Sequence, residues 1–112
     1  MASLSGLRAS VRPIARAFLA EAARRGLAPR VESVRRSREL QKRLYARYLA
    51  GKWPYPVAKP GTSFHEKGLA FDLSSDLGTP GLQRLGALAK AFGIRWGGDF
   101  HTPDPIHFQF GP

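Results

Sequence analysis

Cysteine is absent from the 112-residue sequence, which excludes disulfide bridges and thiolate metal ligands. Any metal that the chain binds must therefore be held by imidazole and carboxylate groups. Long apolar runs are also absent, so we expect no transmembrane segment. A secretory signal is not predicted either, because Glu21 and several arginines interrupt the apolar residues near the start. We therefore expect synthesis in the cytoplasm and, for a target outside it, delivery by another agent.

Acidic residues are scarce, since eight Asp and Glu stand against eighteen Lys and Arg and give a formal net charge of +10. The excess lies in the first half of the chain: residues 1–56 contain thirteen basic and three acidic residues, and residues 57–112 contain five of each. Such a charge favours binding to polyanions, such as nucleic acid, anionic lipid or an anionic cell envelope. The familiar nucleic-acid recognition signatures are missing, so we expect no specific nucleic-acid partner.

The residues that are present suffice for one compact core, because 43% of them are apolar and 11% are aromatic. We predict a single domain over residues 1–112 and a monomer. Residues 1–26 are predicted to contain a basic amphipathic helix that runs from Leu7 to about Arg25. Its apolar side chains recur at steps of three and four residues, at Leu7, Val11, Ile14, Phe18 and Ala22.

A basic stripe accompanies this apolar face. Arg8, Arg12 and Arg16 follow one another at steps of four residues and therefore lie along one side of the predicted helix. Such a stripe is most often a solvated face. The alternative is contact with an anionic surface.

Helix caps, prolines and glycines divide the rest of the chain. A second helix is predicted over residues 37–51 with Ser37 as its cap, and a third over residues 79–93 with Thr79 as its cap. Residues 52–62 contain three prolines and a glycine, so they are predicted to form an irregular loop. Strands are predicted over residues 30–34, 69–73, 94–96 and 106–110, the last two forming a hairpin.

Two of these strands carry a polar side chain on the face opposite their apolar residues. Leu69, Phe71 and Leu73 alternate with Asp72, and Ile106, Phe108 and Phe110 alternate with His107 and Gln109. If the apolar sets are buried, Asp72 and His107 project on the other face.

Two imidazoles and a carboxylate match the three-ligand pattern of catalytic zinc, in which water takes the fourth position. A single histidine or aspartate is weak support, because most such residues are structural. Asp104 precedes His107 by three residues. Beside a metal, its carboxylate can take a proton from water and pass it to a leaving amine.

Residues 63–72, SFHEKGLAFD, resemble a zinc peptidase family at every fixed position of the pattern Ser-x-His-x-x-Gly-x-Ala-x-Asp. The family includes D-alanyl-D-alanine carboxypeptidases, D-Ala-D-Ala dipeptidases and the L-alanyl-D-glutamate endopeptidases of phage endolysins. Residues 104–108, DPIHF, are similar to its second metal motif. Residues 33–37, SVRRS, resemble its Ser-Gly-Tyr-Arg-Ser stretch, with Val34 and Arg35 replacing Gly and Tyr. The resemblance extends over residues 31–110.

The resemblance implies one Zn2+ per chain, held by His65, Asp72 and His107. It further implies that Asp104 is the general base and that Arg36 steadies the scissile carbonyl or a substrate carboxylate. The alternative for Arg36 is one more member of a basic surface.

Four further residues are predicted to contact substrate: Ser63, Gln41, Trp96 and Asp99. Trp96 and Asp99 belong to the stretch WGGDF, which resembles the family's Trp-Gly-Gly-Asp-Trp. Turn formation for Ser63, solvated helix surface for Gln41 and core packing for Trp96 are the alternatives. His101 has no assigned role.

The expected fold is therefore α+β, with a small antiparallel sheet that carries the zinc site on one face and helices packed on the other. The expected function is zinc-dependent hydrolysis of the peptidoglycan stem peptide. An antibacterial, endolysin-like L-alanyl-D-glutamate endopeptidase is favoured, because the short chain and the Trp-Gly-Gly-Asp stretch look most like phage lytic enzymes. Such an enzyme would reach the cell wall after release or within a phage lysis system. D-alanyl-D-alanine carboxypeptidase activity is the alternative. A nonenzymatic basic module that binds nucleic acid or the anionic envelope is the alternative of another class.

Overall fold

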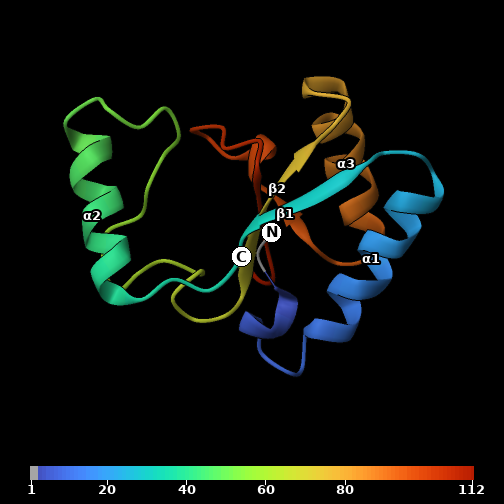
Figure 1. Ribbon diagram of the computed structural model, residues 1–112, viewed down its shortest axis with the longest axis horizontal. Coiled ribbons are helices and arrows are strands. Elements are labelled where there is room, and N and C mark those ends of the chain that lie inside the picture. Colours follow the sequence, from blue (N-terminus) through green and yellow to red (C-terminus); the bar gives the residue numbers. More distant parts are fainter. Residues whose placement is uncertain (1–2) are drawn as a thin grey trace.

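The computed structural model describes residues 3–112, and within them the chain forms three α-helices and one four-stranded antiparallel sheet (Figure 1). The helices are α1 (Arg12–Arg24), α2 (Arg38–Leu49) and α3 (Thr79–Ala91). The strands are β1 (Pro29–Ser33), β2 (Ala70–Ser75), β3 (Arg95–Trp96) and β4 (His107–Gln109), in the order β1-β2-β4-β3. Short 3-10 turns span η1 (Leu4–Gly6) and η2 (Gly97–Asp99). The predicted fold class and the hairpin of β3 and β4 are confirmed.

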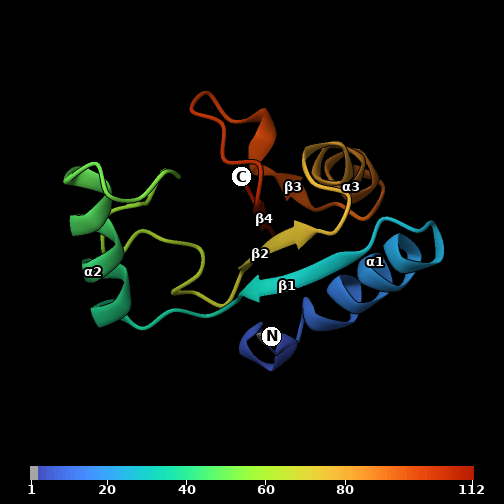
Figure 2. The same cartoon turned by 45° about the horizontal axis from the view of Figure 1, so that its top comes forward.

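The hydrophobic core lies between the sheet and the pair α1 and α3. Phe18 of α1 packs against Phe71 of β2 and Phe108 of β4, and the last two rings stack with centroids 5.6 Å apart. Each of the three rings is fully buried. Burying one such side chain stabilises the fold by about 1.5–3 kcal/mol relative to leaving it exposed. Figures 1 and 2 show α1 and α3 on the same side of the molecule and α2 set apart from both. Two of the three predicted helices therefore pack behind the sheet.

The first helix differs from its prediction in where it starts and in which side chains it buries. It begins at Arg12, and the buried Leu7 belongs to the segment that precedes it. Ile14 is 39% exposed, because the buried stripe runs through Ala15, Phe18 and Ala22. The steps from Ala15 to Phe18 and on to Ala22 are three and four residues, which is close to two turns of 3.6 residues. The predicted steps of four from Ile14 depart further from that period.

The basic stripe is partly structural. Arg8 Nε donates a hydrogen bond to the carbonyl oxygen of Lys67 at 2.8 Å, and Arg12 Nη2 donates one to the carbonyl oxygen of Leu7 at 2.9 Å. Arg16 is exposed. Arg8 thus holds the first segment against the turn at residues 63–68, and Arg12 ties the start of α1 to the residues that precede it.

The predicted N-terminal cap is confirmed for α2 and not for α3. Ser37 caps α2 as predicted, since its Oγ accepts a hydrogen bond from the Leu40 amide at 3.1 Å. The predicted cap Thr79 is wrong: Gly78 occupies that position, and Thr79 is the first helical residue. The capping backbone has φ 67°, which glycine adopts readily and a β-branched threonine does not. No helix in the described part of the chain combines the length and apolar character needed to cross a membrane.

Gly86→Ala should destabilise the fold by about 1–3 kcal/mol, the usual range for overpacking. Gly86 is buried on α3 directly against the Trp96 ring, and an added Cβ would overlap that ring. Chemical denaturation would measure the loss. Ala87→Ser adds one heavy atom on the exposed side of the same helix, so it is the matched control and should change stability little. Equal stability of the two variants would contradict the close helix–strand contact.

Candidate metal centre

The register of the sheet brings Asp72 and His107 together. They face each other as directly paired residues of β2 and β4, and the adjacent pair in the same ladder is Phe71 with Phe108. Successive side chains of a strand point to opposite faces, so burying the two phenylalanines in the core places the polar pair on the other face. Core packing and site assembly are therefore determined by the same register.

A tight turn over residues 63–68 supplies His65. Ser63 Oγ accepts a hydrogen bond from the His65 amide at 3.1 Å, and the Gly68 amide donates to the His65 carbonyl oxygen at 3.3 Å. Gly68 has φ 70°, and a Cβ there would lie 3.1 Å from the carbonyl oxygen of Gly6. The turn accordingly explains the spacing of Ser, His and Gly in the motif.

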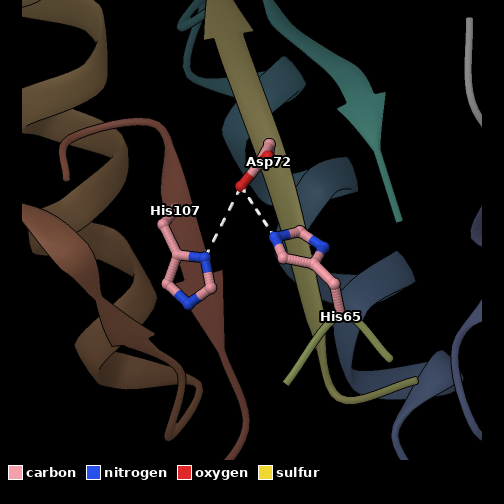
Figure 3. Close-up of side chains that lie close together, drawn as sticks. All are labelled: His65, Asp72 and His107. Atoms are coloured by element: carbon pink, nitrogen blue, oxygen red, sulfur yellow. Dashed lines mark hydrogen bonds and ion pairs between the residues drawn. The ribbon is translucent and has the colours of Figure 1, made fainter. Parts of the chain in front are cut away.

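The three predicted ligands form one cluster (Figure 3). Asp72 Oδ1 lies 3.1 Å from His65 Nε2 and 3.5 Å from His107 Nδ1, and the three ligand atoms lie within 4.8 Å of one another. Ligands of a tetrahedral zinc at its usual bond lengths are separated by about 3.3 Å. The donor set and its spacing therefore fit one zinc ion.

His65 is oriented for this role by the backbone. Its Nδ1 lies 2.6 Å from the carbonyl oxygen of Val34, which accepts a hydrogen bond from Nδ1–H and leaves the lone pair of Nε2 facing Asp72. Metal-binding histidines typically donate their other ring N–H to a partner of this kind. The ring is only 2% exposed, so it has little freedom to turn.

Asp72 is ionised in the site. Burial on its own would raise the pKa of this carboxyl, but the contacts with the rings of His107 and His65 and the charge of Arg36 outweigh burial and hold the pKa well below its usual range. Arg36 Nη2 donates to Asp72 Oδ2 at 2.7 Å, and both side chains are nearly buried. Arg36 thus lies at the metal centre, with part of its guanidinium engaged by a ligand.

Asp104 lies at the same centre with a buried oxygen. Its Oδ1 accepts no hydrogen bond from any residue that the structure describes. Burial raises the pKa of this carboxyl to about 6, and the charge of Asp72 adds to the rise, against the opposing charges of His107 and Arg36. The Asp104 amide donates to the Gly97 carbonyl oxygen at 2.8 Å, which fixes the loop that carries it.

A cavity of about 330 Å³ opens over this cluster. Residues 52–62 form one wall of this cavity, which their prediction as an irregular loop did not indicate. On this wall the rings of Trp53 and Tyr55 meet edge to face, with their centroids 6.4 Å apart. Phe100 lies on the cavity as well, 5.7 Å from the His107 ring. In the sequence, the one indication that Trp53 and Tyr55 belong to the site is that they form an aromatic pair in a proline-rich loop. The cavity is lined by Arg36, Trp53, Tyr55, Pro56, Val57, Ala58, Thr62, Ser63, Phe64, His65, Asp72, Phe100, Asp104, Ile106, His107 and Gln109.

Of the four predicted substrate contacts, the structure places Ser63 on the cavity and the other three off it. Gln41 is fully buried beneath the loop, where its Nε2 donates to the Ala58 carbonyl oxygen at 2.8 Å. Trp96 Nε1 donates to the Pro105 carbonyl oxygen at 2.7 Å and so braces the Asp104 loop.

Asp99 is exposed on η2 and pairs with Lys90 at 3.3 Å. His101 is also exposed and lies outside the ligand cluster. The substrate contacts proposed from the sequence stay predictions, and the observed roles of Gln41 and Trp96 are supports for the site.

Zinc affinity should fall by about tenfold per pH unit once the pH drops below the pKa of His107. Burial on its own would lower the pKa of His107, but the hydrogen bond with Asp72 and the charge of Asp72 outweigh burial and raise this pKa. The ring therefore holds a proton, which competes with zinc, up to a higher pH. Chelator competition across pH would measure the slope.

Without metal, the charged His107 stabilises the fold at low pH, and this contribution is lost as pH rises through the raised pKa of its ring. Thermal stabilisation by zinc should therefore grow with pH, and a flat profile would contradict this account.

Three ligand groups around one metal position, beside a carboxyl of raised pKa, define the site of a metal-dependent hydrolase. A family model described as VanY, D-alanyl-D-alanine carboxypeptidase, matches residues 5–96. The chain belongs to this family. The match includes His65 and Asp72 and ends before Asp104 and His107, which the fold brings to the same place.

Solved structures agree with the family assignment at the level of the fold. A vancomycin-resistance D,D-pentapeptidase VanY mutant from a VanB-type cassette, in complex with Zn(II), has a TM-score of 0.73 and 24% identity, covering 93% of this chain and 72% of that one. VanYB in complex with D-Ala-D-Ala has a TM-score of 0.75 and 24% identity, covering 93% and 71%. The L-Ala D-Glu endopeptidase ChiX of Serratia marcescens has a TM-score of 0.72 and 20% identity, covering 96% and 83%. Curated proteins give no match.

The predicted family and the predicted peptidase class are confirmed by the family match. The predicted zinc agrees with the His-Asp-His cluster and with the Zn(II) of the similar VanY structure. The alternative of a nonenzymatic basic module receives no support from the family match.

Proposed function

We propose that this peptidase cleaves the bond between L-Ala and D-Glu in the peptide stem of bacterial peptidoglycan. The observation that supports this choice of bond is the fold similarity to the L-Ala D-Glu endopeptidase ChiX, 83% of which is covered, against 72% and 71% of the two VanY structures. The charge of the cavity lining does not separate the two reactions. D-Glu keeps one free carboxyl beside the scissile bond, as the terminal D-Ala does, and Arg36 is the one Lys or Arg among the lining residues that the structure describes.

The residues of the chain divide the work of hydrolysis between them. His65, Asp72 and His107 would hold zinc, which, when bound, polarises the scissile carbonyl and lowers the pKa of water. Asp104 takes the proton from the attacking water and donates it to the departing amine, a task suited to a carboxyl whose pKa is about 6. Arg36 holds Asp72 in place and adds positive charge beside the carbonyl oxygen as negative charge develops there.

D-alanyl-D-alanine carboxypeptidase activity is the second candidate. The description of the matching family and the D-Ala-D-Ala bound to the similar VanYB favour it. In either reaction Arg36 would have to divide its guanidinium between Asp72 and a substrate carboxylate.

Digestion of purified peptidoglycan with the zinc-loaded protein separates the two candidates. Mass spectrometry of the products should reveal new D-Glu amino termini, and an Asp104→Asn control should yield none. Release of free D-Ala without D-Glu termini would overturn the endopeptidase proposal in favour of the carboxypeptidase. No zinc-dependent product from several wall types would contradict both.

The exposed basic residues are proposed to attach the enzyme to the anionic envelope after its release, as in a phage lysis system. Because Arg8 and Arg12 are bonded to the backbone, Arg16→Gln is the cleaner test. At low salt it should weaken sedimentation with cell walls by about fivefold, or ~1 kcal/mol, the contribution of one basic residue at an anionic surface. Cleavage of a short soluble stem peptide should not change. Equal loss of wall binding and of peptide cleavage would refute the attachment role.

A further inference from the structure

Gln109 contacts the ring of a metal ligand. It lies on β4 two residues after His107, so both side chains project from the same face of the strand. Gln109 Oε1 lies 2.7 Å from His107 Nε2, and the glutamine is only 7% exposed. Gln109 takes no part in the proposed steps of hydrolysis.

The direction of this hydrogen bond follows from the second contact of the amide. Gln109 Nε2 donates to the carbonyl oxygen of Gly111 at 3.0 Å, so its Oε1 is the atom that faces the imidazole. An amide oxygen only accepts, and His107 Nε2 must therefore carry the hydrogen. The lone pair is then left on Nδ1, the atom that lies 3.5 Å from Asp72 Oδ1 within the ligand cluster.

The two histidines of the cluster are held in different ways. His65 is fixed by a backbone carbonyl, that of Val34, which no substitution removes. His107 is fixed by a side chain, and its ring is therefore the one whose presentation to the metal depends on the sequence at a single position. Partners of this kind orient metal-binding histidines and typically change metal affinity by about 10–100-fold when they are removed.

We propose that Gln109 is a positioning residue that sets the tautomer and orientation of His107, presenting Nδ1 to zinc. The inference rests on the zinc site of the proposed function. It assigns Gln109 no contact with substrate and no part in proton transfer.

Zinc affinity, measured by chelator competition, is the first test. Gln109→Met keeps a side chain of similar length without the acceptor, and it should bind zinc about 10–100-fold more weakly than the native protein. Gln109→Glu restores an acceptor and should bind at least tenfold more tightly than the Met variant. Gln83→Met makes the same replacement on the exposed face of α3 and should leave affinity unchanged. A Gln109→Met affinity within twofold of native would overturn the proposal.

A second measurement needs no variant and holds even if Gln109→Met fails to fold. Nitrogen-15 NMR of the histidine rings in the native zinc-loaded protein should show His107 protonated at Nε2 and metal-bound through Nδ1. The opposite assignment would overturn the role of Gln109 while leaving zinc binding and cleavage intact. Absence of zinc binding by the native protein would instead overturn the proposed function together with this inference.

Discussion

Asp104→Asn should reduce peptidoglycan cleavage by about 10²–10⁴-fold, the usual contribution of a general acid–base group, and should leave zinc binding intact. Asn retains the shape of the side chain but can neither accept nor release a proton at neutral pH. Asp104 is not one of the three clustered ligands, and its buried Oδ1 has no partner among the described residues. Initial rates on a soluble stem peptide and the zinc content per chain would be measured together.

The matched control is Asp76→Asn, which makes the same replacement at an exposed position after β2, where the side chain pairs with Arg30. Its rate should remain close to that of the native protein. If Asp104→Asn retained more than a tenth of the native rate, another group would have to carry the proton. If it lost zinc, Asp104 would belong to the metal site instead.

Asp72→Asn should lose zinc and destabilise the metal-free fold. The amide is a far poorer metal ligand than a carboxylate, so affinity should fall by more than the roughly 100-fold that an outer hydrogen-bond partner can cost. The change also leaves Arg36 without its counter-ion in a nearly buried position. Removing one partner of a buried ion pair costs about 3–5 kcal/mol. Chelator competition and denaturant titration of the metal-free protein would measure the two effects.

His65→Gln separates these two effects, since it removes a ligand and retains the pair of Arg36 with Asp72. It should lose zinc to a similar extent and lose less stability without metal. His101→Gln changes an exposed histidine outside the cluster and should alter neither quantity. Equal zinc affinity in the two histidine variants would show that the ion is held elsewhere.

Much of the fold could be predicted because its local signals agree with its tertiary packing. The alternation of Phe71 with Asp72 and of Phe108 with His107 predicted both strands and the faces they present, and the observed pairing confirms them. The start of α1 was mispredicted because Leu7 continues the apolar spacing although the helix begins only at Arg12. Its burial arises from tertiary contacts, which helical periodicity does not distinguish from burial along a helix.

The candidate site was predictable only in part, for a similar reason. The motif spacing identified Ser63, His65 and Asp72, whose turn and strand are local structures. The resemblance alone could not reveal that Gln41 is buried under the 52–62 loop, because that contact joins residues 17 positions apart. Nor could it reveal that Trp96 braces the loop of Asp104 instead of lining the cavity.

Anomalous diffraction at the zinc edge, from crystals of the zinc-loaded protein, tests whether His65, Asp72 and His107 hold one zinc ion. A single strong peak is expected within about 2.0–2.2 Å of His65 Nε2, an Asp72 carboxylate oxygen and His107 Nδ1. A peak bound to His101, or one coordinated through His107 Nε2, would contradict this assignment.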